Sequence, residues 1–289
     1  MKKNFILTLS FAFILSTFVP YSANAENSIN FPPPREDETP ISKDNGPTEQ
    51  ELDKFQEEYD KEMQAILDEN PISPEEMDQL EAEKAERSDA DYIEKEKVPT
   101  DPRSLPTNDQ ELNQMMEEAE LHPDSDPLGK TAASESIPDR SSGKAKWNKF
   151  INGDIAVARG ASSLPWGYYR HCGVWSTSNK KLITANISNG LKVQWETQTQ
   201  WNKSYSKIKG VSVNSMSAHK TKKAVKYMIA QLGEPYRLSA KTVSYSWYCS
   251  KLAWAGYKGQ GTDIDKDGGR YVTVDDIYND NNTKVFTSF

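Results

Sequence analysis

The 289-residue chain is poor in the side chains that bind metals or form cross-links. It holds two cysteines and three histidines. Two cysteines can form at most one disulfide, so a small scaffold stapled by several disulfides is excluded. A zinc site built from His171, Cys172 and Cys249 lacks a fourth ligand and the usual ligand spacing. We therefore expect neither a bound metal nor a cofactor.

Long apolar runs are also scarce. The run from Phe5 to Val19 follows a positive start, Met1-Lys2-Lys3, and is too short for a comfortable membrane span. Ala23-Asn24-Ala25 has the small-residue pattern of a signal-peptidase site. We predict that residues 1–25 are a signal peptide cleaved after Ala25. No cysteine closely follows that position and no second apolar span appears, so we expect a secreted or cell-wall protein without a lipid anchor or a transmembrane segment.

Charge is divided unequally between the two parts of the remaining chain. Residues 26–140 carry 34 acidic and 11 basic side chains, whereas residues 141–289 carry 9 acidic and 22 basic ones. All seven tryptophans lie in the second part. These shifts predict an acidic, Pro-rich region at 26–140 and a basic globular domain at 141–289, which is long enough to bury one core.

The acidic region contains helix start signals despite its composition. Thr48 to Glu51, Ser73 to Glu76 and Thr107 to Gln110 have the spacing of capping boxes. A narrow apolar stripe of helical spacing follows the first box, formed by Leu52, Phe55, Tyr59, Met63 and Ile66. Such thinly apolar helices bury too little surface to be stable alone. We expect a largely disordered region with short helices that need a docking partner.

The basic domain offers one pairing of a thiol with an imidazole. His122 lies in a Pro/Asp-rich linker and His219 in a Lys-rich helix, which leaves His171 as the candidate base. Successive strand residues point to opposite faces, so if His171 faces a cleft, Cys172 should face away from it. Cys249 opens an expected helix, where the helix dipole and an imidazole favour a thiolate. The sequence therefore favours Cys249 and His171 as a nucleophile and base.

The expected elements place the base before the nucleophile in an α+β fold. Strands are predicted at 153–158, around His171, at 181–186 and at 191–195. A helix should follow Ser217 and end near Gly233 and Pro235, and a short one should run from Tyr248 to Tyr257.

Five motifs in this order resemble a known family. They are Gly153-Asp154-Ile155, Arg170-His171-Cys172-Gly173-Val174, Gly233-Glu234-Pro235-Tyr236, the segment 247–254 around Cys249, and the tail Asp265 to Gly269 with Val272 to Ile277. This set resembles the YiiX/YebB-like branch of the NlpC-type superfamily over about residues 148–280. The resemblance implies a circularly permuted papain-like fold and a thiol hydrolase.

The resemblance also implies roles for individual residues. Cys249 would be the nucleophile, His171 the general base, and backbone N–H groups at Cys249 part of an oxyanion hole. A polar residue that orients the imidazole should come from the strand after the histidine, where Thr184 and Asn186 share one face. Alignment favours Thr184 and hydrogen-bonding chemistry favours Asn186. The family often has an acidic, amide or second histidine side chain at this position, so the match there is poor.

Competing interpretations remain for both the site and the substrate. Cys249 and His171 can be ordinary core residues, and a Cys172–Cys249 disulfide would consume the nucleophile. The resemblance implies amide cleavage in cell-wall peptides, with peptidoglycan as the substrate. The alternatives are an acyl hydrolase or acyltransferase acting on lipids, and a non-catalytic binding module. Lysine clusters in the basic domain match no nucleic-acid motif, so we expect no nucleic-acid partner.

Two further segments have open interpretations. Asp263 to Gly268 mimics the first half of an EF-hand loop, but Val274 stands where a bidentate glutamate is needed, which favours a surface turn. The acidic region, at about residues 45–125, is either a pro-segment docked over the catalytic cleft of the basic domain or a solvated spacer.

Overall fold

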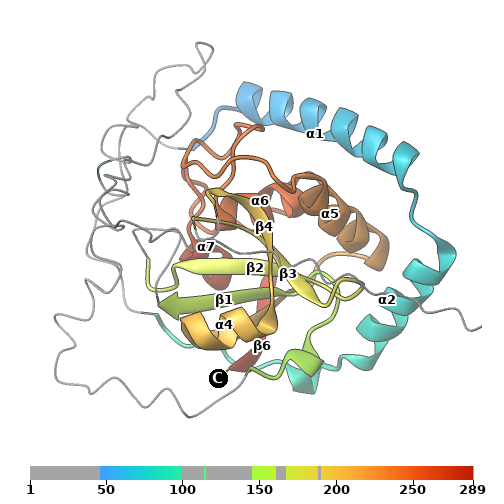
Figure 1. The fold of residues 1–289 in the computed structure, drawn as a ribbon, viewed down its shortest axis with the longest axis vertical. Coiled ribbons are helices and arrows are strands. Elements are labelled where there is room, and N and C mark those ends of the chain that lie inside the picture. The colour runs from blue at the N-terminus through green and yellow to red at the C-terminus, as the bar shows by residue number, and fades with distance from the viewer. Residues whose placement is uncertain (1–45, 99–113, 115–144, 161–166, 188–189, 289) are drawn as a thin grey trace, which may run out of the picture. The chain divides into compact units, whose positions relative to one another are not determined.

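The computed structural model describes residues 46–98, 114, 145–160, 167–187 and 190–288, which include one antiparallel sheet and the helices that pack on it (Figure 1). The sheet has the strand order β4-β3-β2-β1-β5-β6. The bounds of its strands are β1 Ile155–Gly160, β2 His171–Ser176, β3 Lys181–Asn186, β4 Lys192–Glu196, β5 Tyr205–Val213 and β6 Thr283–Ser288. The domain is thus a mixed α/β structure, and each strand predicted from the sequence is present.

The pairing of the central strands decides which side chains share a face. Val174 pairs with Ile183 and Trp175 with Leu182, while Leu182 also pairs with Glu196 on β4. Because side chains alternate along each strand, His171, Asn186 and Glu196 lie on the same face as Trp175. Cys172 lies on the opposite face.

Aromatic side chains fill the core on the face of His171. The members of this cluster come from η2 (Trp147–Lys149) and the residues that flank it, from the strands and from α4 (Gln198–Ser204). The cluster includes Ala145, Trp147, Phe150, Ala156, Ala158, Trp175, Leu182, Trp201, Ile208 and Phe286. Gly173 leaves room for the Trp201 ring, because a Cβ at residue 173 would lie 3.2 Å from that ring.

Two helices, α5 (Ala218–Ala230) and α6 (Cys249–Lys258), pack on the sheet and on each other. Ser217 caps α5 by accepting from the Lys220 N–H, as the sequence predicted. Gly256 allows the two helices to approach closely, because a Cβ there would lie 2.4 Å from the Met228 methyl group. The nucleophile candidate Cys249 is the first residue of α6.

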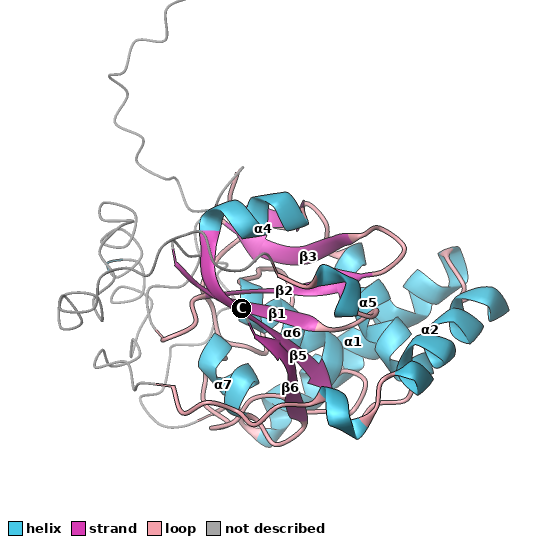
Figure 2. Ribbon diagram, turned by 90° about the horizontal axis from the view of Figure 1, so that it is seen from below, coloured by secondary structure: helices cyan, strands magenta, loops and turns pink. Residues whose placement is uncertain are grey.

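Part of the acidic region packs against this domain. The helices α1 (Glu49–Glu69) and α2 (Pro74–Glu86) begin at the two predicted capping boxes, and both boxes are formed. Phe55, Tyr59 and Met63 from the predicted apolar stripe are buried. Both helices lie against α5, and Figure 2 shows them together with α5 on one side of the strands. The third box, Thr107 to Gln110, lies outside the described residues.

The segment after α2 continues along the domain to the far edge of the sheet. Arg87 makes a bidentate ion pair with Asp154, with N–O distances of 2.7 and 2.8 Å. After η1 (Asp89–Asp91), Ile93 forms an antiparallel bridge with Val285 of β6. The predicted boundaries at residues 25 and 140 lie outside the described residues. No helix in the described ranges is long and apolar enough to cross a bilayer.

Candidate active site

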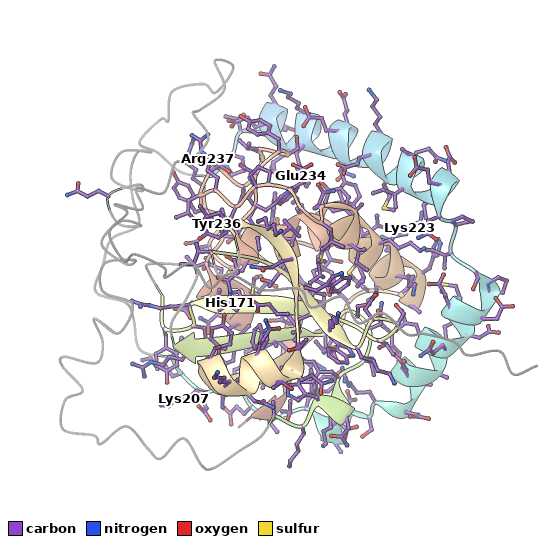
Figure 3. The ribbon with its side chains drawn as sticks, in the orientation of Figure 1. His171, Lys207, Lys223, Glu234, Tyr236 and Arg237 are labelled. Atoms are coloured by element: carbon purple, nitrogen blue, oxygen red, sulfur yellow. The ribbon has the colours of Figure 1, made fainter. Side chains whose placement is uncertain are left out.

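The imidazole of His171 is held between a carboxylate and a thiol. Its Nε2 lies 2.9 Å from Oε2 of Glu196, the last residue of β4. The ring also shares a side-chain hydrogen bond with Cys249. His171 projects from β2 in Figure 3 and is fully buried. The structure therefore brings the two predicted residues, Cys249 and His171, together with Glu196, which the sequence alone does not mark.

Aromatic rings fix the plane of the His171 imidazole. Tyr205 stacks on it with a centroid distance of 4.9 Å, and Trp201 lies 5.1 Å away. The Tyr205 hydroxyl accepts from Asn186 Nδ2 at 3.1 Å. Packing on both the ring and its carboxylate partner leaves the imidazole little freedom to rotate, which is the usual requirement for a positioned base.

Cys249 is positioned by the residues on either side of it. Ser250 donates to the Val272 carbonyl at 2.6 Å, and the Tyr248 hydroxyl accepts from the Val272 N–H at 3.1 Å. Tyr248 is the N-cap of α6 and makes no side-chain capping bond. The thiol therefore stands at a helix N-terminus whose positive dipole end no cap side chain neutralises, a setting that favours a thiolate.

Cys172 lies on the strand face opposite His171, as strand alternation predicts, and its side chain nevertheless reaches Cys249. Cys172 and Cys249 are both thiols with no disulfide, yet a hydrogen bond links their side chains. The reason is that α6 packs on β2, so the strand face opposite His171 also meets the start of this helix. Burial, followed by the contact with Cys249, raises the pKa of the Cys172 thiol, which keeps it protonated.

The two residues proposed to orient the imidazole take other positions. Thr184 donates to the Cys172 carbonyl at 2.6 Å, and Asn186 donates to Glu196 Oε1 at 2.6 Å. Asn186 thus holds the carboxylate that bonds to the imidazole. The sequence signal for Glu196 is period-2 alternation in β4, which puts Gln194 and Glu196 on the His171 face once the strand register is known.

The charges of the site stabilise one another. Burial lowers the pKa of His171, but the Glu196 charge and the hydrogen bond with Cys249 outweigh it and raise this pKa to about 9. Burial raises the pKa of Glu196, and the opposing effect of the His171 charge and its hydrogen bonds leaves it lowered overall. At neutral pH the pair is an imidazolium and a carboxylate.

Another carboxylate fixes the segment that leads into β2. Asp275 accepts from the backbone N–H groups of Tyr168 and Tyr169, at 2.6 and 2.9 Å. It belongs to α7 (Val274–Asn279), which begins at a complete capping box between Thr273 and Asp276. The tail motif recognised in the sequence thus holds the chain two residues before His171.

The thiol and imidazole are covered in this structure. Cys249 is 2% exposed and His171 0%. A cavity of about 530 Å³ lies between α1, the start of α5 and the end of α6, lined in part by Gln56, Lys220 and Gly261. Neither Cys249 nor His171 lines it. The cavity is therefore separate from the candidate catalytic residues.

Comparisons with known proteins give one structural similarity. No protein-family model matches the chain, and no curated protein matches it. A crystal structure described as the metalloprotein YiiX from Escherichia coli O157:H7 is similar with a TM-score of 0.38 and 17% identity. The match covers 48% of this chain and 95% of that one.

Proposed function

We propose that the protein is a secreted thiol hydrolase in which Cys249, His171 and Glu196 form the catalytic triad of a permuted papain-like domain. The observation that carries the proposal is the His171 imidazole, held between the Cys249 thiol and the Glu196 carboxylate. The chain order of histidine, acid and cysteine supports the permuted topology. A carboxylate on the far nitrogen stabilises the imidazolium and sets the tautomer of the neutral imidazole, as in other nucleophile–histidine–acid sites.

The reaction would proceed through a thioester. The Cys249 thiolate attacks the carbonyl carbon of the scissile amide, and the oxyanion is stabilised by backbone N–H groups at the start of α6. The His171 imidazolium gives its proton to the leaving nitrogen, and the C–N bond breaks. Neutral His171 then takes a proton from water, which attacks the thioester, and the acid product leaves as Cys249 is restored.

Peptide amides of peptidoglycan are the substrate we propose. This choice rests on the predicted signal peptide, which would bring a basic domain to anionic wall polymers. Acyl groups of lipids are the second candidate, because they would pass through the same thioester at Cys249. We infer no nucleic-acid substrate.

The first test is the pH dependence of iodoacetamide alkylation, followed by mass spectrometry on residues 26–289. Although it is only 2% exposed, Cys249 should label faster than Cys172 below neutral pH, because the imidazolium of His171 favours its thiolate. Cys172, with its raised pKa, is an internal reference that should label slowly. The His171→Ala variant should lose the rapid labelling of Cys249.

Substrate turnover is the second measurement on the same preparations. Purified peptidoglycan should release new amino groups with the wild type and none with Cys249→Ala, whereas lipid acyl release would favour the second candidate. Labelling of Cys249 only at ordinary thiol pH, unchanged in His171→Ala, would contradict the catalytic proposal and favour a binding module.

A further inference from the structure

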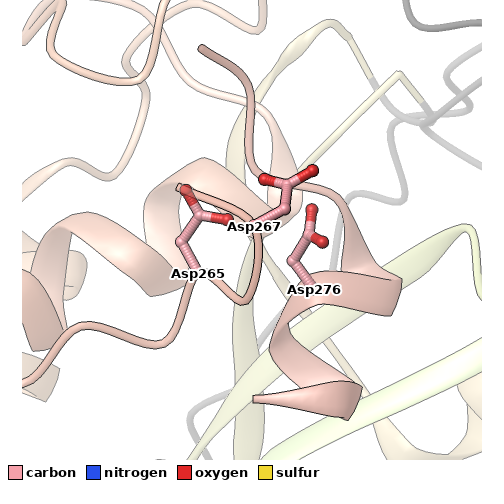
Figure 4. Close-up of side chains that lie close together, drawn as sticks. All are labelled: Asp265, Asp267 and Asp276. Carbon is pink, nitrogen blue, oxygen red and sulfur yellow. The ribbon is translucent and has the colours of Figure 1, made fainter. Parts of the chain in front are cut away.

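We propose that Asp265, Asp267 and Asp276 bind a calcium ion that ties the 263–272 loop to α7. One oxygen from each carboxylate lies within 4.8 Å of the other two. Figure 4 shows the three carboxylates turned toward one another from the loop and the helix. The binding site is independent of the proposed catalytic function and is argued from these residues alone.

Each of the three carboxylates uses one oxygen for a bond to the protein. Asp265 Oδ2 accepts from the Lys241 ammonium, Asp267 Oδ1 from the Gly269 N–H, and Asp276 Oδ2 from Thr273. These bonds fix the orientation of the carboxylates. They leave the second oxygen of each group available to a ligand.

Asp265 gives the observation that points to a missing ligand. Its side chain is 0% exposed, and its Oδ1 atom is buried with no hydrogen-bond partner. A buried carboxylate oxygen without a partner has a large desolvation cost, so such an atom is normally satisfied by a donor or a cation. A cation shared with Asp267 and Asp276 would satisfy it.

The charge of the cluster matches a divalent ion. Three carboxylates carry three negative charges, and among the described residues the cation bonded to them is Lys241. Two negative charges are left over, which is the charge that one divalent cation neutralises.

The ligand chemistry favours calcium over softer metals. Calcium takes six to eight oxygen ligands at about 2.3–2.6 Å, so ligand oxygens on opposite sides of it lie about 5 Å apart. Separations within 4.8 Å fit this range. Asp267 is exposed, so water can reach the site and complete the coordination.

The arrangement differs both from an EF-hand loop and from the plain surface turn that the sequence favoured. Asp263 accepts from Trp254 Nε1 at 2.9 Å and from Lys258 Nζ at 2.7 Å. It therefore ties the loop to α6 and is not part of the carboxylate cluster. Val274 indeed offers no ligand, but Asp276, two residues later, is brought in by α7. The first half of the loop motif is therefore combined with a helix-start carboxylate.

The position of the cluster gives the ion a structural role. Val272 in the same loop holds both neighbours of Cys249, and Asp275 on α7 holds the segment before His171. A cation would lock these two supports together. The effect on catalysis rests on the proposed function, whereas ion binding does not.

Isothermal titration with CaCl₂ on residues 26–289, after treatment with EDTA and desalting, tests the binding. We expect one calcium ion per chain, a dissociation constant of about 10⁻⁷ to 10⁻³ M, and weaker binding of MgCl₂. The melting temperature should rise with added calcium, because only the folded chain presents all three carboxylates. The Cys249→Ala variant should bind calcium as the wild type does.

Variants assign the site to its residues. Asp267→Asn should weaken calcium binding by about tenfold or more, and because this side chain is exposed the protein should fold. Asp78→Asn, at an exposed position on α2, removes the same charge and should bind as the wild type. Absence of heat and of any thermal shift at about 10 mM CaCl₂, above the usual range of protein calcium sites, would overturn the proposal. Equal binding by Asp267→Asn would do so as well.

Discussion

The pairing of His171 with Glu196 is the contact on which the proposed chemistry depends most. A buried imidazolium is costly unless an opposite charge accompanies it. Glu196 supplies that charge at 2.9 Å, and Asn186 holds the carboxylate in place from its other oxygen. The result is a histidine that stays protonated across neutral pH, as an ion pair with a thiolate requires.

Glu196→Gln should therefore change the pH profile of the site. The raised pKa of His171, about 9, depends on the Glu196 charge working against burial. With glutamine, the pKa of His171 should fall, so the imidazolium is lost at lower pH as the solution becomes more alkaline. Without the imidazolium the Cys249 thiolate forms only nearer ordinary thiol pH, so we expect the rise of the Cys249 alkylation rate to move to higher pH, with rates near pH 7.5 reduced by about tenfold or more.

Thr184→Val is the matched control for this variant. Thr184 lies on the same strand face but donates to the Cys172 carbonyl. Its loss should leave the pH profile of Cys249 unchanged. An unchanged profile in Glu196→Gln, measured beside it, would show that the carboxylate does not set the charge of His171.

The two predicted catalytic residues could be found from sequence, whereas Glu196 could not. Cys249 and His171 are marked by local patterns, a helix start and a strand with one histidine. Glu196 is set beside His171 by the pairing of β2 with β3 and of β3 with β4, and register depends on contacts between distant residues. Thr184 and Asn186 lie on β3, the strand that directly follows His171 in the chain, whereas Glu196 lies one strand farther, on β4.

Helix α1 docks on α5 and α6 through a few large side chains. The Tyr59 ring lies 4.3 Å from that of Tyr227, and its hydroxyl donates to the Gly256 carbonyl at 3.2 Å. Gly259 makes this approach possible, because a Cβ there would lie 2.2 Å from the Tyr59 ring. Phe55 packs against Trp254, farther along α6 than Cys249. The helix is therefore fastened away from the start of α6.

Tyr59→Ala tests whether α1 belongs to the same cooperative unit as the domain. Removing a fully buried aromatic ring leaves a cavity and an unpaired Gly256 carbonyl, so the free energy of unfolding should fall by about 3–5 kcal/mol. Urea denaturation followed by circular dichroism would measure it. Glu57→Ala, exposed on the opposite face of α1, should change the stability by less than about 0.5 kcal/mol.

Equal stability of these two variants would mean that α1 detaches before the domain unfolds.

The local signals for helix α1, its capping box and its apolar stripe, can be recognised in the sequence. The surface it occupies cannot. That surface exists only after α5 and α6 have packed, and its small residues, Gly256 and Gly259, read in the sequence only as the end of a helix.

The opposite charges of the two parts of the chain meet in specific contacts. Lys222 pairs with Glu76 at 2.7 Å, and Lys209 pairs with Glu96 at 2.9 Å. Arg87 reverses the pattern, since a basic side chain of the acidic region pairs with the buried Asp154. Part of the lysine excess of the basic domain thus serves contacts within the chain. Fewer lysines are left to meet an anionic substrate than the composition suggests.

The chain of residues 141–289 alone is the decisive comparison for the acidic region. The contacts described place α1 on the later turns of α6, so we expect truncation to destabilise the domain without uncovering the thiol. It would expose the apolar surface that covers Phe55, Tyr59, Met63 and Leu80, and it would leave the Asp154 carboxylate buried without Arg87. Breaking a buried ion pair by removing one partner alone costs about 3–5 kcal/mol.

Melting temperature, solubility and the rate of Cys249 alkylation should be measured for residues 26–289 and 141–289 at low and high salt. We expect the shorter chain to melt at a lower temperature or to aggregate, and its Cys249 to label no faster where it remains folded. Arg87→Met in the longer chain removes the ion pair with Asp154 but keeps both helices. It should therefore reproduce part of the loss of stability. A folded 141–289 domain with faster labelling of Cys249 would instead identify the acidic region as an inhibitory pro-segment. In that case high salt should also speed the labelling of Cys249 in the longer chain, because it screens the charges that hold the acidic region in place.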